Sequence, residues 1–97
     1  MIRIIFIIIV LVVLAFTYFF GGSDTERDVI FTANAPMPIG PYSQGIKIGN
    51  TLYVSGQIGM TLQEKMDTTT IQTEVMQALK NVEAIVTMAG MEMKDVV

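Results

Sequence analysis

The feature that most limits what this sequence can fold into is an uncharged apolar run near its start. Residues 4–20 hold seventeen successive side chains without a charge, most of them β-branched or aromatic. As a helix the run would be about 26 Å long, close to the ~30 Å hydrocarbon core of a bilayer. Inside lipid a backbone must satisfy its own hydrogen bonds, so a helix is predicted despite the β-branched composition. A soluble domain of 97 residues could not bury so uniform a segment.

Two interpretations of this helix stay open at this stage. It is either an uncleaved membrane anchor or a secretory signal peptide with Arg3 as its basic start and Gly21 or Ser23 near the cleavage site. We therefore divide the chain into an anchor or signal peptide over residues 1–23, a linker over 24–28 and a body over 29–97.

The charges that flank the apolar run predict its orientation. Arg3 precedes it, whereas the residues that follow at 24–28 are mostly acidic. Basic residues favour the cytoplasmic side, so the body is expected on the outer, periplasmic or extracellular, side. It would be held at the membrane by the anchor or exported after cleavage.

The composition excludes several kinds of chemistry. The sequence contains neither Cys nor His, so it holds no disulfide, thiolate nucleophile, His-based triad or Cys/His metal site. Its net charge of −3 argues against a nucleic-acid-binding protein, which would need a basic surface. Any reaction must use Tyr, Ser, Arg, Lys, carboxylates, backbone amides or water.

The body shows a pattern of short strands followed by one helix. Residues 29–32 are predicted to form a strand, and the three prolines between 34 and 41 an extended loop. Residues 46–48 and 51–55 are predicted to form a hairpin that turns at Gly49-Asn50, with Leu52 and Val54 on one face and Tyr53 on the other. Lys47 is expected on the solvent face of that hairpin.

A helix is predicted over residues 68–89, capped by Thr68 or Thr69 and ended by Gly90. Its apolar residues recur at helical spacing and should form a stripe that packs on the sheet. Residues 95–97 are expected to begin another strand. The stripe comprises Ile71, Val75, Leu79, Val82, Val86 and Ala89.

Two sequence blocks resemble the first half of the reactive intermediate deaminase (RidA, also called YjgF) family. The first is Asn-Ala-Pro-Met-Pro-Ile-Gly-Pro-Tyr-Ser-Gln-Gly at 34–45, and the second is Gly-Asn-Thr-Leu-Tyr-Val-Ser-Gly-Gln-Ile at 49–58. Shorter blocks continue the resemblance along the helix to residues 95–97. It covers residues 29–97, with a shortened loop between 58 and 68.

The resemblance implies an α+β fold of the chorismate-mutase-like type, in which helices pack on a mixed β-sheet and three subunits form a trimer. It also implies hydrolysis of small enamine or imine substrates, such as 2-aminoacrylate, to 2-keto acids and ammonia, without a metal or organic cofactor. By resemblance, Tyr42, Ser55 and Gly56 would bind the substrate. Some family members are described as ribonucleases, but the acidic balance and the lack of His give that activity no support here.

The resemblance also implies that important groups are missing. The family's carboxylate-binding Arg, its water-handling Glu and the C-terminal half of its fold lie beyond the position that matches Val97. The chain is therefore expected to be a truncated deaminase, inactive alone. The alternative is a RidA-like trimer outside the cytoplasm that binds small carboxylates without turnover.

Overall fold

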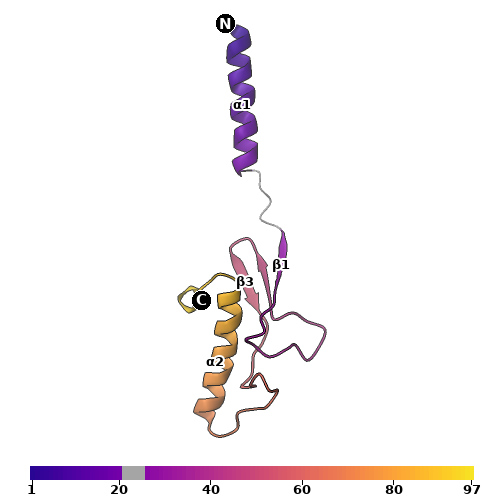
Figure 1. Ribbon diagram of the computed structural model, residues 1–97. Coiled ribbons are helices and arrows are strands. Elements are labelled where there is room, and N and C mark those ends of the chain that lie inside the picture. The colour runs from indigo at the N-terminus through magenta and orange to yellow at the C-terminus, as the bar shows by residue number, and fades with distance from the viewer. Residues whose placement is uncertain (21–25) are drawn as a thin grey trace.

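The computed structural model describes residues 1–20 and 26–97 (Figure 1). Gly21, Ser23 and the start of the predicted linker lie outside the described residues. The described elements are α1 (Ile2–Phe20), β1 (Arg27–Ile30), β2 (Gly45–Ile48), β3 (Thr51–Val54), α2 (Ile71–Met88) and the short 3₁₀ helix η1 (Met93–Asp95).

Helix α1 covers the whole uncharged run and begins two residues before it. None of its 19 residues is buried. With a rise of ~1.5 Å per residue it is about 28 Å long, so its length and composition allow it to cross a membrane. A signal sequence at the N-terminus would have the same properties.

The three strands form an antiparallel sheet in the order β1-β2-β3. The predicted hairpin is confirmed, and Gly49 takes the left-handed conformation at its turn with φ 57°. Strand β1 starts at Arg27, two residues before the predicted strand. Arg27 pairs with Ile48 of β2. Arg27 and Asp28, which the sequence analysis assigned to the linker, therefore belong to the sheet.

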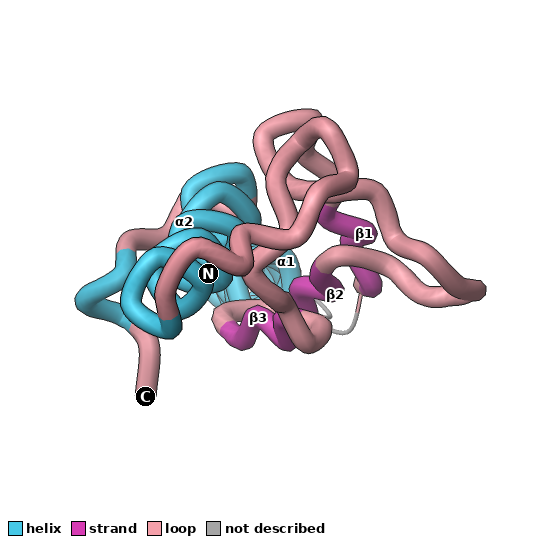
Figure 2. Tube along the Cα trace, turned by 90° about the horizontal axis from the view of Figure 1, so that it is seen from below, coloured by secondary structure: helices cyan, strands magenta, loops and turns pink. Residues whose placement is uncertain are grey.

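Helix α2 covers one face of this sheet, and the other face is open among the described elements (Figure 2). Leu52 and Val54 pack with the core under α2, whereas Tyr53 lies on the opposite side and is 62% exposed, as the alternation predicted. The open face carries the apolar side chains of Val29, Ile46 and Ile48 with Tyr53, and it also carries Arg27 and Thr51.

The prediction that Lys47 lies on a solvent face is wrong. Lys47 pairs with Leu52 across the hairpin and so shares its α2-facing side. The Lys47 ammonium donates a hydrogen bond to the carbonyl oxygen of Ala89 at 3.2 Å. A cation is favourable there because helix C-termini carry a partial negative charge and unpaired carbonyls.

Thr70, rather than Thr68 or Thr69, caps the start of α2. The hydroxyl of Thr70 accepts from the Thr73 amide at 3.1 Å, and the hydroxyl of Thr73 accepts from the Thr70 amide at the same distance. The Thr69 amide and the Thr73 hydroxyl also donate to the Asp67 carboxylate, which holds the pKa of Asp67 below its usual value. These bonds support the cap at neutral pH and are lost as acid protonates Asp67.

The end of α2 follows the prediction at Gly90. Gly90 has φ 77°, and the amides of Gly90 and Met91 donate to the carbonyls of Thr87 and Val86 at 2.9 and 3.1 Å. This is the Schellman arrangement that ends many helices at glycine. The strand expected at residues 95–97 does not form, because the Asp95 carboxylate accepts from the Glu92 amide and closes the 3₁₀ turn instead.

The predicted apolar stripe of α2 is only half correct. Val86 and Ala89 are buried as expected, but Ile71 is 77% exposed, and Val75 and Leu79 are also exposed. The helix is rotated so that Ile85 enters the core with Ile30 and Ala35. An apolar groove of about 460 Å³ remains between α2, β3 and the last residues, and it is lined in part by Leu52, Val54, Val82, Val86, Met91 and Val96.

Gly59 provides a test of how closely the loop before α2 packs on the helix. A Cβ at Gly59 would lie 2.7 Å from the Glu74 carbonyl oxygen, which is backbone and cannot move aside cheaply. We expect Gly59→Ala to lower the free energy of unfolding by about 1–3 kcal/mol. The measurement is urea unfolding in mild detergent, followed by hydrogen exchange of the α2 amides.

Gly56→Ala is the matched control, because a Cβ there has no atom within 4 Å. Its free energy of unfolding should stay within about 0.5 kcal/mol of the parent chain. Equal losses for the two variants would contradict the packing described here.

Candidate functional site

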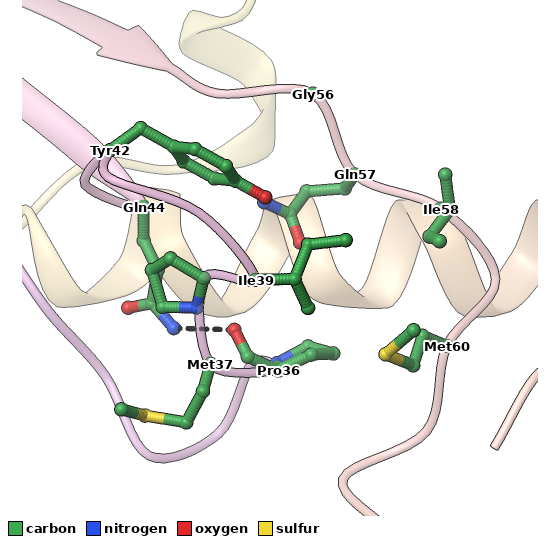
Figure 3. Close-up of a pocket in the computed structure, with 10 residues that line it drawn as sticks. Pro36, Met37, Ile39, Tyr42, Gln44, Gly56, Gln57, Ile58 and Met60 are labelled. Carbon is green, nitrogen blue, oxygen red and sulfur yellow. Dashed lines mark hydrogen bonds between the residues drawn. The ribbon is translucent and has the colours of Figure 1, made fainter. Parts of the chain in front are cut away.

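Two loops meet at the end of the sheet where β1 stops and β2 begins. One is the proline-rich segment 34–43, and the other is the segment 55–60 that follows β3. They enclose a cavity of about 40 Å³ (Figure 3). This is much smaller than the ~300–1,000 Å³ of typical small-molecule sites. Its walls comprise Pro36, Met37, Pro38, Ile39, Tyr42, Gln44, Gly56, Gln57, Ile58 and Met60.

The side-chain amide of Gln44 holds the proline-rich wall in place. Gln44 is 2% exposed, and its oxygen accepts from the Thr32 amide at 2.7 Å. Its nitrogen donates to the carbonyls of Thr32, Ala35 and Pro36 at 3.0, 3.3 and 3.0 Å. Prolines supply no amide donor, so the carbonyls in this loop need a donor from elsewhere. Gln44 therefore replaces the sheet hydrogen bonds that the loop cannot make.

Asn81 does the same for the opposite wall. It lies on the buried face of α2, and it is 1% exposed. Its side-chain nitrogen donates to the carbonyls of Ile58 and Met60, each at 2.9 Å. Its side-chain oxygen accepts from the side-chain amide of Gln77 at 3.0 Å. The two walls are thus fixed by two buried amides on different elements.

Tyr42 and Gly56, two of the three predicted site residues, line this cavity together. The Tyr42 ring packs against Gly40, where a Cβ would lie 3.1 Å from the ring. Figure 3 shows the phenol directed toward the segment that carries Gly56 and Gln57. The open space beside Gly56 leaves its backbone accessible to a small molecule.

Ser55, the third predicted residue, lies in a neighbouring open depression of about 660 Å³ that Tyr42 also lines. The hydroxyl of Ser55 donates to the carbonyl oxygen of Gln44 at 3.0 Å, and its amide donates to the same oxygen. The hydroxyl proton is therefore donated to the backbone, and the Ser55 oxygen accepts a long hydrogen bond of 3.4 Å from the Gln57 side chain, which leaves one lone pair for a ligand.

Arg27 is a lining residue of that depression which the sequence analysis missed. A guanidinium can pair with a carboxylate through two parallel hydrogen bonds. The alternation of Arg27, Val29 and Phe31 is the sequence pattern that could have indicated this position. It places Arg27 on the same strand face as Val29.

Neither hollow is lined by a carboxylate. Within residues 1–20 and 26–97, no three Asp or Glu side chains are grouped so that they could hold a metal ion. The chemistry available at these surfaces is that of the Tyr42 and Tyr53 phenols, the Ser43 and Ser55 hydroxyls, backbone amides and the Arg27 guanidinium.

Residues 32–97 match the sequence model of the family described as Endoribonuclease L-PSP. A 2-iminobutanoate/2-iminopropanoate deaminase from Dermatophagoides farinae is 50% identical over 74 residues, and the human protein of the same name is 44% identical over 76. The chain belongs to the RidA family. The two alignments cover 75% and 77% of this chain.

Solved RidA-type structures have the same fold as the body. The Rid family protein YyfA from Yersinia pestis aligns with a TM-score of 0.71 and 38% identity over 74% of this chain and 58% of its own. Escherichia coli TdcF with bound serine aligns with a TM-score of 0.69 and 37% identity over 72% of this chain and 55% of its own. The chain also spans only 58% and 56% of the two deaminases.

The role of Gln44 can be tested by removing its polar atoms. Gln44→Leu would leave the Thr32 amide and the carbonyls of Thr32 and Pro36 without their partner in a buried place. Each unsatisfied buried group costs about 1–3 kcal/mol, so we expect a loss of at least about 3 kcal/mol in the free energy of unfolding. Urea unfolding gives this value.

Gln57→Leu is the control, because the Gln57 amide makes only two long hydrogen bonds of 3.4 Å and is half-buried. It should cost about 1 kcal/mol or less. A similar loss for both variants would mean that Gln44 does not hold the loop.

Proposed function

We propose that this chain supplies Tyr42, Ser55 and Gly56 to a RidA-type imine deaminase site. The observation that carries the proposal is the convergence of the two family signature segments, 34–45 and 49–58, on one cavity. The relatives named 2-iminobutanoate/2-iminopropanoate deaminase support the same reaction class.

The proposed reaction is hydrolysis of a 2-imino acid. Water adds to the imine carbon, a proton moves to the nitrogen, and the carbon–nitrogen bond breaks. The products are the 2-keto acid and ammonia, so one water is consumed and no electron is transferred. A 2-aminoacrylate substrate first takes a proton on its methylene carbon and loses one from its nitrogen, which gives the imine.

The hydrogen-bonding state of each residue suggests its role. Because the Ser55 hydroxyl donates its hydrogen bond to the carbonyl oxygen of Gln44, the Ser55 oxygen is suited to accept a hydrogen bond from the imine N–H. The backbone beside Gly56 can contact the small substrate closely. The Tyr42 phenol can donate to a substrate oxygen and hold it near these groups.

The site as described lacks a group to activate water, since no carboxylate lines either hollow. The family resemblance places that Glu, and the Arg that binds the substrate carboxylate, after the position of Val97. We therefore propose that residues 29–97 form one part of the catalytic site and do not catalyse the reaction alone.

The second candidate function is binding of small carboxylates without turnover. Arg27, Tyr42 and Ser55 line one open depression and together provide a cation and two hydroxyl groups. This set could hold a carboxylate but has no group that would activate water. The solved structure of TdcF with bound serine supports such a ligand class.

We also propose that copies of this chain associate through the open face of the sheet. The exposed Val29 and Tyr53, with Ile46 and Ile48, form an apolar surface of the kind that marks protein–protein contacts. The resemblance implies a trimer, in which neighbouring subunits would complete the sites.

Helix α1 is proposed to anchor the body at the outer surface of a membrane. None of its 19 residues is buried and only Arg3 among them is charged, while Arg3 and the acidic residues after the helix favour a cytoplasmic N-terminus. The same features would suit a signal peptide, which the experiment below distinguishes from an anchor.

The enzymatic proposal can be tested by joining residues 1–97 to the C-terminal part of the D. farinae deaminase that follows the aligned region. We expect this chimera to release ammonia and keto acid from 2-iminopropanoate generated in the assay, and the present chain to give only the solvent rate. Tyr42→Phe in the chimera should lower kcat/KM about tenfold, the equivalent of one hydrogen bond.

Tyr18→Phe is the matched control, because Tyr18 lies in α1, lines neither hollow and should change kcat/KM less than about twofold. Equal effects of the two substitutions would contradict the role of Tyr42. Calorimetric binding of serine or 2-ketobutyrate to a chimera without turnover would favour the binding function instead.

The anchor can be tested by expressing the chain in bacteria and washing the membranes with carbonate. We expect the intact 10.7 kDa chain to stay in the membrane fraction. Ile9→Arg should release it, because a central Arg costs about 2.5–3.5 kcal/mol of insertion, whereas Ile9→Leu should not. A shorter soluble product with a new N-terminus near Gly21 or Ser23 would show a cleaved signal peptide.

A further inference from the structure

We propose that the tether, the segment of residues 21–26 between α1 and β1, joins the body at the end opposite the small cavity lined by Tyr42 and Gly56, so that this cavity faces away from the bilayer. This inference rests on the proposed anchoring by α1. It concerns which end of the body meets the lipid headgroups, and it follows from strand register and from contacts along α2.

The tether enters the body at Arg27, the first residue of β1. Arg27 is paired with Ile48, and Ile48 with Thr51, so the hairpin turn at Gly49-Asn50 lies at this same end of the sheet. The bond from Lys47 to the Ala89 carbonyl brings the C-terminus of α2 to this end as well. These groups together form the tether end of the body (Figure 1).

The small cavity lies farther along α2, whereas the open depression beside it extends to Arg27. Asn81, which holds Ile58 and Met60, is eight residues before Ala89 and therefore about 12 Å from it along the helix axis. Gly59 packs against Glu74, which is about 22 Å from Ala89. The proline-rich wall follows β1 at its other end, where Ile30 pairs with Gly45. Both walls thus belong to the end distant from the tether.

The covalent reach of the tether prevents the body from turning over completely. Phe20 and Arg27 are seven residues apart, which allows at most about 25 Å even at full extension. Helix α2, with 18 residues, is about 27 Å long. To place the first turn of α2 on the bilayer, the tether would have to run back over about 27 Å, which exceeds its full extension.

This orientation would leave the small cavity open to small soluble molecules without passage through the headgroup layer. The surface nearest the lipid would instead be the hairpin turn, the end of α2 and η1. Two exposed polar loops, the hairpin turn at Gly49-Asn50 and the turn that follows Met60, would therefore lie at different distances from the lipid. This difference in distance can be measured.

The experiment uses the full chain, which has no native Cys, in liposomes that contain a lipid-bound acceptor dye. Asn50→Cys reports the tether end, and Gln63→Cys reports the turn that follows Met60. Both positions are exposed and neither side chain is needed for a hydrogen bond described here. Each carries a donor dye, and the loss of donor emission is compared after flotation of the liposomes.

We expect a greater loss of donor emission from Asn50→Cys than from Gln63→Cys. Lys94→Cys and Thr68→Cys, exposed positions after and before α2, form a second pair and should give the same order. Equal losses, or the reverse order in either pair, would overturn the orientation while leaving the anchor intact. Failure of the parent chain to float with the liposomes would overturn the anchor itself.

Discussion

The candidate site depends on two buried side-chain amides. The loops that form its walls cannot use sheet hydrogen bonds, and one of them contains three prolines. Gln44 and Asn81 provide the missing donors, one from the residue just before β2 and one from α2. The position of Tyr42 and the space beside Gly56 follow from the loops that these amides fix. Side chains from α2 and from the residue before β2 thus determine the shape of a site whose walls are loops.

The elements that sequence patterns identified well are those fixed by local chemistry. Gly49 and Gly90 mark a turn and a helix end because each residue takes a positive φ there. The faces of the elements were less predictable, since they depend on how α2 docks. Asn81 interrupts the apolar stripe, and a polar residue at such a position is normally assigned to solvent. Its two bonds to a distant loop rotate the buried face toward Ile85 and leave Leu79 exposed.

The positions of the site residues could also be predicted only in part. Tyr42 and Gly56 were selected through family resemblance, and the structure places both on one cavity, but Ser55 lines the depression on the other side of Tyr42. Spacing along the chain could not separate Ser55 from Gly56, because successive residues at a strand end point in different directions. Arg27 was assigned to the linker because charged residues rarely signal the start of a strand.

The apolar groove beside β3 has a consequence for handling the protein. Among the described strands, β3 pairs only with β2, so its outer edge offers unpaired amides and carbonyls next to Val82, Val86 and Met91. Such edges are templates for pairing between chains, and natural proteins usually protect them. Copies held in one membrane plane by the proposed anchor would meet at a higher effective concentration than in solution. The tendency of the protein to aggregate therefore depends on whether this strand edge is covered, and not only on the stability of the single chain.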